Sequence, residues 1–483
     1  MRTTIVVFNK KGNPVLSTVI DALKNTQVEQ TMNFTVASSE KIVSHKSLDV
    51  LSRQGINSPI VVGCSFTNET KKVYSFQQLD KGNVTTIFEG IKYASVEVTK
   101  ENNVREIIKK LARDEVQLQN FVEKIDGDYL SFILKNEKIS VVRDPIGVQP
   151  LYYGENKELA AFASNRKILW QLDIDEPLSF PPGNLCLLTK AGFQFKPIKT
   201  FVYTEPIQIS IDEASLKLQK FLEHTVKTRV AELKEVAVAF SGGLDSSLIA
   251  YIVSKCGVKV DLIHVSLENE QEIETAFDAS EKLGLPMQVH LFKESDVEKI
   301  LPEVVDVIEE VDPVKTAIGV PVYWAAQKAQ EAGYTALFAG QGADELFGGY
   351  QRYVNEYCKY GSEKVRQTMF NDVIRIHENN LERDKKICIN ANVELRLPFG
   401  SFDLAEFALS LPVDLKFEQK QDSLRKLVLR RVALNLGLPA SIVNKPKKAV
   451  QYSTGINNAI KRLAQKKGQT VNEYIAKFSQ RKH

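Results

Sequence analysis

Two glycine-rich turns, each placed directly after a short apolar segment, most constrain how this chain can fold. The first, SGGLDSS at 241–247, follows VAVAF and opens the amphipathic segment LIAYIVSK. The second, AGQGADELFGGY at 339–350, lies at the end of TALFAG. Around them, apolar runs of strand length alternate with segments of helical period, a pattern typical of a parallel sheet covered by helices. Turns at the carboxyl ends of parallel strands converge on one crevice, so the sequence predicts an α/β domain with a ligand site there.

The order strand, small-residue turn, helix predicts a phosphate pocket at the first turn. Glycines let the backbone approach an anion, and the start of a helix offers unpaired N–H groups. The hydroxyls of Ser241, Ser246 and Ser247 add donors. Asp245 repels phosphate but is suited to hold Mg2+ that bridges to it, with Asp344 of the second turn as a second metal ligand. Taken singly, each turn is also compatible with an ordinary capped helix start; together they favour the phosphate site.

The first two hundred residues are rich in predicted strands, with one charged helix predicted at 104–113. The strand segments are TIVVF, SPIVVGCSF, YLSFIL, ISVVRD, LAAFAS and NLCLLTK. A polar connection at 200–210 leads into IDEASLKLQKFLEHTVKTRVAEL, whose apolar residues recur at helical spacing. We therefore predict two domains, 1–205 and 206–483, the second becoming mostly helical after residue 350.

Composition excludes several classes of protein. Lys and Arg number 63 against 60 Asp and Glu, a net charge of +3, so we expect no nucleic-acid partner. No apolar run is long enough for a bilayer span, and the start MRTTIVVF lacks the features of a secretory signal. Five widely spaced cysteines without a CxxC pair predict neither disulfides nor a zinc site. We expect a cytoplasmic protein with no membrane partner, and a homodimer is an open possibility.

Beyond the two turns, the sequence resembles the asparagine synthetases, which are ATP-using amide ligases of the PP-loop, or N-type ATP pyrophosphatase, superfamily. SGGLDSS resembles the pyrophosphate loop of that family and GQGADELFGGY its second nucleotide motif, while VELRLPF at 393–399 and KPKKAVQYSTG at 445–455 resemble later signature blocks. In the first half, GDYLSFIL, RDPIGVQPLYYG, FASNRKILW and FPPGNL resemble the glutaminase domain of the same enzymes. The resemblance implies an α+β domain of the N-terminal nucleophile hydrolase type, followed by the α/β synthetase domain.

The resemblance also implies roles for individual residues. The residues expected at the pyrophosphate end of ATP are Ser241, Gly242, Gly243, Asp245, Ser246, Ser247, Gly340 and Gly342. Val265 and Ser266 are expected beside the adenine, with Asp245 and Asp344 on Mg2+. Glu394, Lys447 and Gln341 are the expected catalytic residues, although Glu394 could instead form a structural ion pair with Arg396, and Lys447 is one of several lysines. In the implied reaction a carboxylate attacks the α-phosphorus of ATP, and an amine converts the acyl-adenylate to an amide and AMP.

The front half departs from glutamine-dependent members of the family. Those enzymes carry a nucleophilic cysteine directly after the initiator Met, where this chain has Arg2, and the family's Asn-Gly-Glu string is absent. Cys64 follows an apolar segment and is expected to be buried rather than catalytic. We therefore expect no glutaminase activity, so that the amine is free ammonia or belongs to another substrate.

The acceptor region departs as well. Gln341 stands where bacterial glutamine-dependent synthetases usually carry Glu and cannot act as a general base, which leaves Glu394, water or a substrate group. AIGVP at 317–321 replaces an arginine-bearing segment expected near aspartate, with Lys315 as a candidate substitute.

Three hypotheses follow from these departures. The first is synthesis of asparagine from aspartate, ammonia and ATP. The second is the same adenylation of another small carboxylate, as in the related β-lactam-forming cyclases. The third is a non-catalytic ATP-binding scaffold, against which the retention of Asp245 and Asp344 beside their glycines argues.

Overall fold

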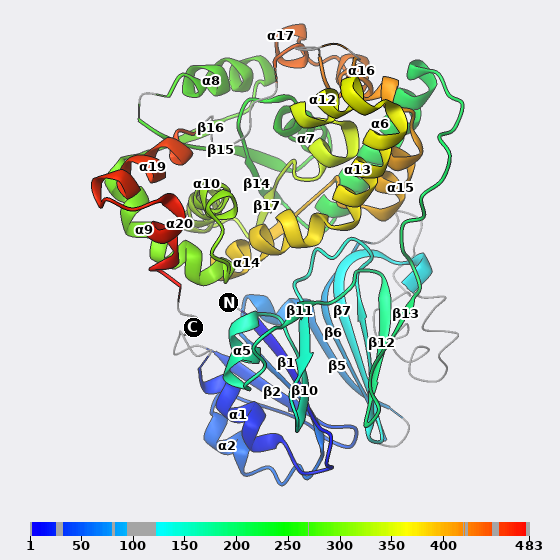
Figure 1. Ribbon diagram of the computed structural model, residues 1–483, viewed down its shortest axis with the longest axis vertical. Coiled ribbons are helices and arrows are strands. Elements are labelled where there is room, and N and C mark those ends of the chain that lie inside the picture. Colours follow the sequence, from blue (N-terminus) through cyan, green and yellow to red (C-terminus); the bar gives the residue numbers. More distant parts are fainter. Residues whose placement is uncertain are drawn as a thin grey trace. The chain divides into compact units, whose positions relative to one another are not determined.

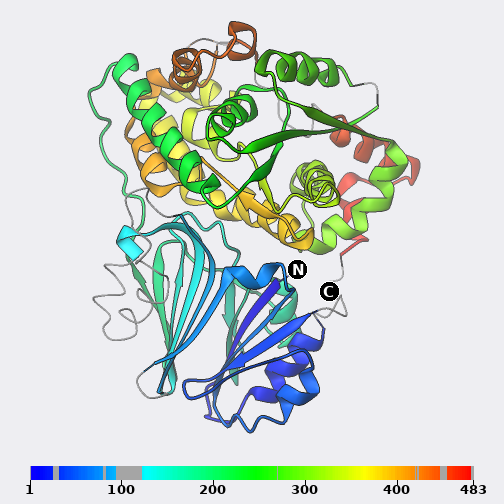
Figure 2. The ribbon, with the colours of Figure 1, turned by 180° about the vertical axis from the view of Figure 1, so that it is seen from behind.

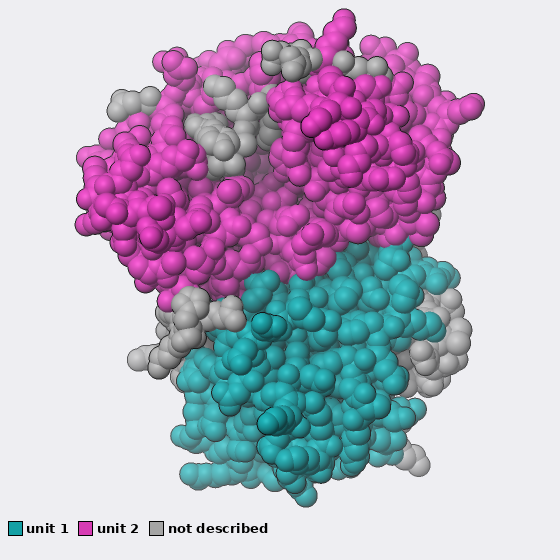
Figure 3. All heavy atoms as spheres, viewed as in Figure 1, with its two compact units in different colours: residues 1–200 teal, residues 201–483 magenta. Residues whose placement is uncertain are grey.

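The computed structural model describes residues 2–25, 32–79, 83–93, 122–268, 270–418, 420, 424–446 and 454–479. The chain divides into two compact units, Met1–Thr200 and Phe201–His483 (Figure 3). The boundary predicted from sequence falls five residues further along the chain. The charged helix predicted at 104–113 lies outside the described residues.

Unit 1 contains two antiparallel sheets (Figure 1). The first has the order β11-β9-β10-β1-β4-β2-β3, with β1 (Arg2–Asn9), β2 (Asn33–Ala37), β3 (Ile42–His45), β4 (Ile60–Phe66), β9 (Tyr152–Glu155), β10 (Leu159–Ala163) and β11 (Leu178–Ser179). The second has the order β13-β12-β8-β7-β6-β5, with β5 (Tyr74–Leu79), β6 (Val84–Tyr93), β7 (Asp126–Lys135), β8 (Lys138–Arg143), β12 (Asn184–Thr189) and β13 (Gly192–Pro197). All six apolar segments predicted as strands are strands.

The two sheets of unit 1 enclose one apolar core, and helices cover the outer face of the first sheet. Val6 and Phe8 of β1 pack in one cluster with Phe132 of β7 and Val141 of β8. The alternate residues Ile5 and Val7 belong to a second cluster, shared with α1 (Leu16–Lys24), α2 (Leu48–Ser52) and α5 (Arg166–Gln171). Burial of both faces explains why β1 is apolar along most of its length rather than alternating.

Unit 2 is built on a parallel sheet with the order β16-β15-β14-β17-β18 (Figures 1 and 2). The strands are β14 (Glu235–Ala239), β15 (Lys259–Leu267), β16 (Met287–Phe292), β17 (Ala336–Phe338) and β18 (Glu394–Arg396). From β14 the chain steps outward through α7 (Leu244–Ser254) and α8 (Glu272–Leu283), then returns through α9 (Glu294–Ile308) and α10 (Pro313–Glu331) to β17 on the other side of β14. The crossovers are right-handed and run in opposite directions, so α7 and α8 lie on one face of the sheet and α9 and α10 on the other. The strand order reverses between β14 and β17.

Unit 2 also contains α6 (Ile211–Val230) and α11 (Ala343–Phe347), and the helices that follow confirm the prediction that the chain is mostly helical after residue 350. These are α12 (Gln351–Tyr360), α13 (Ser362–Ile374), the π-helical η3 (His377–Leu381), α14 (Glu382–Asn390), α15 (Phe402–Ser410), the 3-10 turn η4 (Val413–Leu415), α16 (Leu427–Asn435), α17 (Ala440–Val443), α19 (Ile456–Lys466) and α20 (Val471–Ala476). Within the described parts of the chain, none of the helices combines the length and apolar character needed to cross a membrane.

Two elements of unit 2 differ from the sequence expectation. The helix expected to run through Glu310 ends at Ile308, because Glu309 adopts a left-handed conformation with φ of 59°. A further helix, α10, was not predicted: it starts at Pro313 under an Asp312 cap and contains Pro321, so the AIGVP segment is helical. The short strand β18 was also not predicted from VELRLPF; its pairing with β17 is a tertiary contact that three residues cannot signal alone.

Candidate functional site

The first glycine-rich turn joins β14 to α7 in a tight backbone arrangement. Gly242 has φ of +66°, and a Cβ atom there would lie 2.7 Å from the Cα of Ala276, so only glycine fits. Gly243 caps α7, and its N–H donates to the hydroxyl of Ser241 at 3.3 Å. The hydroxyls of Ser241 and Ser246 lie 3.2 Å apart. The turn therefore presents hydroxyls and the start of a helix at the carboxyl end of β14.

The second turn lies against the first because β14 and β17 are parallel neighbours. Ala237 pairs with Leu337, which brings the carboxyl ends of both strands to one edge of the sheet. A Cβ on Gly340 would lie 2.9 Å from that of Asp245, a contact that leaves little room for a side chain. Gly342 caps α11 with φ of +94°. The two turns therefore converge in the structure, as expected from their positions after parallel strands.

The two predicted metal ligands meet at one lysine. Lys426 Nζ lies 2.5 Å from Asp245 Oδ2 and 2.6 Å from Asp344 Oδ1, and its side chain is 1% exposed. Asp245 Oδ1 is buried without a hydrogen-bond partner. Sequence reasoning missed Lys426, because it lies in a stretch with several other Lys and Arg residues and no spacing distinguishes it. The carboxylates converge as expected, and a buried ammonium balances their charge.

A cavity of about 220 Å3 opens beside both turns. The predicted residues that line it are Ser241, Asp245, Ser246, Val265, Gly340, Gln341 and Asp344. Gly242, Gly243, Ser247, Ser266, Gly342 and Glu394 are not among its lining residues, and Lys447 lies outside the described residues. One cavity thus collects side chains from both turns and from β15.

Buried polar atoms without partners occur on His264, which lines this cavity, and on two serines that follow lining residues in the chain. His264, which lines it, donates a hydrogen bond from Nδ1–H to the carbonyl of Phe240 at 2.9 Å, while Nε2 has no partner. Burial lowers the pKa of His264, so the ring is neutral at pH 7. The hydroxyls of Ser247 and Ser266 are also buried without partners. Such groups are costly unless a ligand satisfies them, and the free Nε2 of His264 in the cavity wall fits a polar ligand such as a nucleotide.

Arg383, Asp384 and Gln341 form a charged network in the wall of the cavity. Arg383 Nε donates to Asp384 Oδ1 at 2.7 Å, and Gln341 Nε2 donates to Asp384 Oδ2 at 2.5 Å. Arg383 Nη2 is buried without a partner, and all three residues line the cavity. Sequence reasoning missed Arg383, which lies in the charged run ERDKK, where no spacing distinguishes one residue from the next. A guanidinium with a free N–H is suited to hold a carboxylate.

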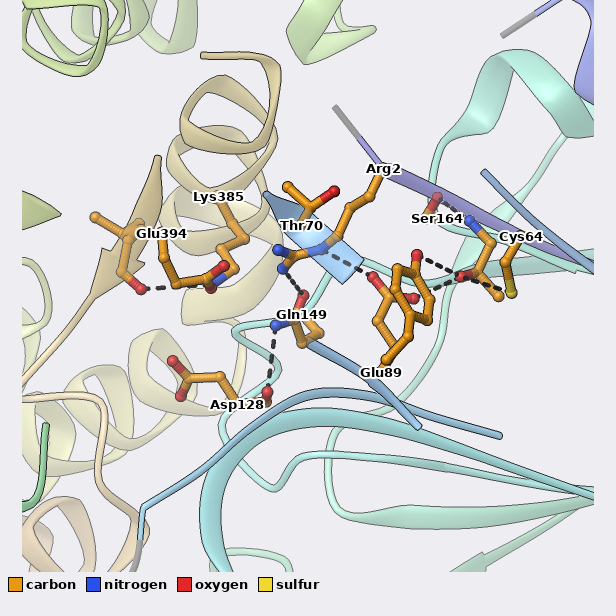
Figure 4. A network of polar contacts seen from close by, with 12 residues as sticks. Arg2, Cys64, Thr70, Glu89, Asp128, Gln149, Ser164, Lys385 and Glu394 are labelled. Atoms are coloured by element: carbon orange, nitrogen blue, oxygen red, sulfur yellow. Dashed lines mark hydrogen bonds and ion pairs between the residues drawn. The ribbon is translucent and has the colours of Figure 1, made fainter. Parts of the chain in front are cut away.

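Two other candidate residues are engaged elsewhere. Glu394 is ion-paired with Lys385 of α14, whose side chain is fully buried (Figure 4). Lys385 Nζ also reaches the carbonyl of Leu395 at 3.4 Å. Lys315 is ion-paired with Glu310, donates to a backbone carbonyl, and does not line the cavity. Neither Glu394 nor Lys315 is therefore positioned by this structure as a direct contact of a ligand in the cavity.

Arg2 is built into the interior of unit 1 (Figure 4). Its side chain is 2% exposed, with Nε 3.1 Å from Glu89 Oε1 and Nη2 donating to Gln149 Oε1 at 3.2 Å. Glu89 Oε2 accepts from Thr4 at 2.6 Å, and Thr4 also contacts Cys64. Cys64 is fully buried, as expected, and burial raises the pKa of its thiol well above the usual range. A neutral thiol at pH 7 is a poor nucleophile.

The chain is similar in sequence to two known protein families and to several known proteins. The family described as asparagine synthase matches residues 217–361 and 359–481, and a glutamine amidotransferase domain matches 78–171. A Methanocaldococcus jannaschii protein assigned as an asparagine synthetase (glutamine-hydrolyzing) is 33% identical over 404 residues, 73% of this chain and 74% of that protein. The Asparagus officinalis asparagine synthetase (glutamine-hydrolyzing) is 26% identical over 70% of this chain and 59% of its own length.

Among solved structures, a glutamine phosphoribosylpyrophosphate amidotransferase from B. subtilis, complexed with ADP and GMP, aligns with 59% of this chain and 65% of its own. The TM-score is 0.34 at 13% sequence identity.

Proposed function

The chain belongs to the asparagine synthase family, a family of ATP-dependent amide ligases, and from this premise we propose that it activates the side-chain carboxylate of aspartate with ATP and amidates it with free ammonia. The carboxylate attacks the α-phosphorus of ATP and releases pyrophosphate; ammonia then attacks the acyl-adenylate and releases AMP. The observation that carries the proposal is that both glycine-rich turns and the guanidinium of Arg383 line one cavity. Catalysis of this kind requires positioning and charge neutralisation more than an enzyme nucleophile.

The phosphates of ATP are assigned to the turn between β14 and α7. Its hydroxyls and helix start are donors of the kind that cradle phosphate, and Lys445 Nζ reaches the carbonyl of Gly242 at 3.2 Å, which adds a cation beside the turn. The adenine is assigned to the wall that contains Val265 and His264. The unpartnered Nε2 of His264 is an acceptor, because Nδ1 carries the proton of the neutral ring, and it fits the amino group of the base.

Mg2+ is assigned to Asp245 and Asp344, whose oxygen ligands and convergence suit a hard divalent cation. When bound, the metal ion would neutralise charge on the phosphate oxygens. Lys426 contributes a fixed positive charge to the same place and holds both carboxylates in position.

The acceptor is assigned to the end of the cavity lined by Arg383. Its free Nη2 is placed to bind the carboxylate of aspartate that does not react, while the bonds of Asp384 to Arg383 and Gln341 fix both side chains. Glu394 acts as a positioning residue. Its ion pair with Lys385, which also donates to the carbonyl of Leu395, fixes β18, and Leu395 of that strand lines the cavity. The proton of the amine then leaves to water or to a substrate group.

Free ammonia is favoured over glutamine by the environment of Arg2. Its guanidinium is ion-paired with Glu89 and donates to Gln149 in the interior of unit 1, and a guanidinium is not a nucleophile. Cys64 is no substitute, because burial keeps its thiol protonated.

A second candidate keeps the adenylation and changes the acceptor. Ile318, Pro321 and Val322 of α10 line the cavity with apolar surface, so a less polar carboxylate than aspartate is compatible with this wall. Comparing aspartate with aliphatic amino-dicarboxylates and monocarboxylates separates the two candidates.

The test is release of AMP and pyrophosphate by the purified protein with ATP, Mg2+ and aspartate, in the presence of ammonium, glutamine or no amine. The proposal expects asparagine from ammonium alone, and its loss in Asp245→Ala. Efficient use of glutamine would refute the amine assignment, whereas turnover only with another carboxylate would favour the second candidate.

A further inference from the structure

Unit 2 contains a second cavity, of about 190 Å3, that shares no lining residue with the first. Its volume is far above the ~15 Å3 that one water molecule needs. Most of its wall is apolar, formed by Phe201, Val202, Met369, Phe370, Leu409, Leu411 and Val413. Such a wall suits a small molecule with an apolar part.

Lys416, directly after η4, lines this cavity and is 3% exposed. Its backbone N–H donates to the carbonyl of Val413 at 2.8 Å, which fixes the residue in place. Among the residues the structure describes, its ammonium group has neither a hydrogen-bond nor an ion-pair partner. Burial, together with the charge of Arg366, lowers the pKa of Lys416 to about 7. An unpaired charge in such surroundings is unfavourable unless an anion accompanies it.

The other cation in the wall is already engaged. Arg366 of α13 lies 2.7 Å from Glu363 and 3.5 Å from Glu205, and donates to the carbonyl of Thr204 at 2.5 Å. Because Arg366 is engaged, the ammonium of Lys416 is the cationic group left for a ligand. The lining residues also include one with a carboxylate, Glu406 of α15.

We propose that this cavity binds a small aliphatic monocarboxylate, with the carboxylate on the ammonium of Lys416 and the tail against Met369 and the surrounding apolar wall. One unengaged ammonium matches a single negative charge, whereas phosphate is usually held by several charge-assisted donors, often from Arg. The inference rests on this cavity alone and does not depend on the reaction proposed for the first one.

Butyrate is the probe, measured by calorimetric titration and by the shift in Tm of the full-length protein. Butyramide, of the same shape without the charge, is the neutral comparison. Lys416→Met removes the charge and keeps a similar volume, and Lys364→Met makes the same substitution at an exposed lysine of α13. Met369→Trp fills the cavity and leaves Lys416 intact. We expect the wild type and Lys364→Met to bind butyrate with a Kd of about 1 mM and both other variants to bind at least about tenfold more weakly.

Three results would overturn the inference: no butyrate binding by the wild type, equal binding of butyramide, or unchanged binding in Lys416→Met and Met369→Trp. The Asp245→Ala protein separates the two cavities. Butyrate binding that survives in that variant supports the second cavity even if no enzymatic activity is found, whereas loss of butyrate binding there would assign the carboxylate to the first cavity.

Discussion

Gly349→Ala tests whether the ion pair between Asp344 and Lys426 contributes to kcat/KM for ATP. Gly349 has no positive φ, so alanine is free to adopt its backbone conformation. The added Cβ would nevertheless lie 1.8 Å from Asp344 Oδ1 and 2.5 Å from Lys426 Cε. Cβ atoms essentially never lie within 3.0 Å of another heavy atom, so the carboxylate must move by more than ~1 Å. The substitution should therefore break the ion pair without straining the backbone.

The expected loss follows from the strength of that interaction. A hydrogen bond to a charged group contributes about 1.5–3 kcal/mol, which corresponds to roughly a 10- to 100-fold fall in kcat/KM for ATP. Pyrophosphate release at several ATP concentrations gives this ratio, and urea unfolding gives the accompanying change in stability, for which overpacking predicts about 1–3 kcal/mol.

Gly319→Ala is the matched control. Its added Cβ meets Val304 Cγ1 at 3.0 Å and Ile387 Cδ1 at 3.4 Å, and none of the three residues lines the first cavity. We expect kcat/KM within about twofold of the wild type, because a helix-interior alanine costs no backbone strain. Wild-type kcat/KM in Gly349→Ala would show that the contact of Asp344 with Lys426 plays no part in ATP use.

Three further predictions concern buried charges. Lys426→Met leaves two carboxylates without their shared ammonium, so pyrophosphate release should fall about 100-fold, as measured in the same assay; an unchanged rate would contradict the role given to this residue. Arg2→Cys leaves Glu89 buried without its cation and should lower the free energy of unfolding in urea by about 3 kcal/mol without producing glutamate from glutamine; efficient glutamine hydrolysis would show that Arg2 alone blocks the reaction. The pKa of Lys416 falls from 10.5 to about 7 on folding, so between these pH values the unfolded chain binds the extra proton and wild-type stability rises with pH. Lys416→Met should thus be more stable than the wild type at pH 7, with an advantage that shrinks by at most ~1.4 kcal/mol per pH unit above it, and parallel pH profiles of unfolding would refute this.

The part of the candidate site formed by the two glycine-rich turns is accessible from sequence because it is local. SGGLDSS and GQGADELFGGY each combine a strand end, a turn and a helix start within a few residues, and parallel pairing then brings the two together. Residue order and turn chemistry alone are therefore enough to pair Asp245 with Asp344. Both carboxylates also contact Lys426, which lies 181 residues after Asp245 in the chain, and no spacing in the sequence signals that contact.

Burial, more than residue type, decided the remaining assignments. The ERDKK run of α14 consists of charged residues, yet all five are buried, and one of them, Arg383, lines the first cavity while another, Lys385, holds Glu394. Lys416 resembles any other lysine in the sequence and differs only through the apolar wall around it.

The sequence by itself determined the α/β class of the second unit, the strand-rich first unit, the location of the two glycine-rich turns and the presence of arginine at position 2. These follow from periodicity, turn chemistry and residue identity, which act over a few neighbouring positions. Only the tertiary structure decided which charged groups face a cavity and which neutralise one another, because the free energy of a charge depends on the groups packed around it from distant parts of the chain.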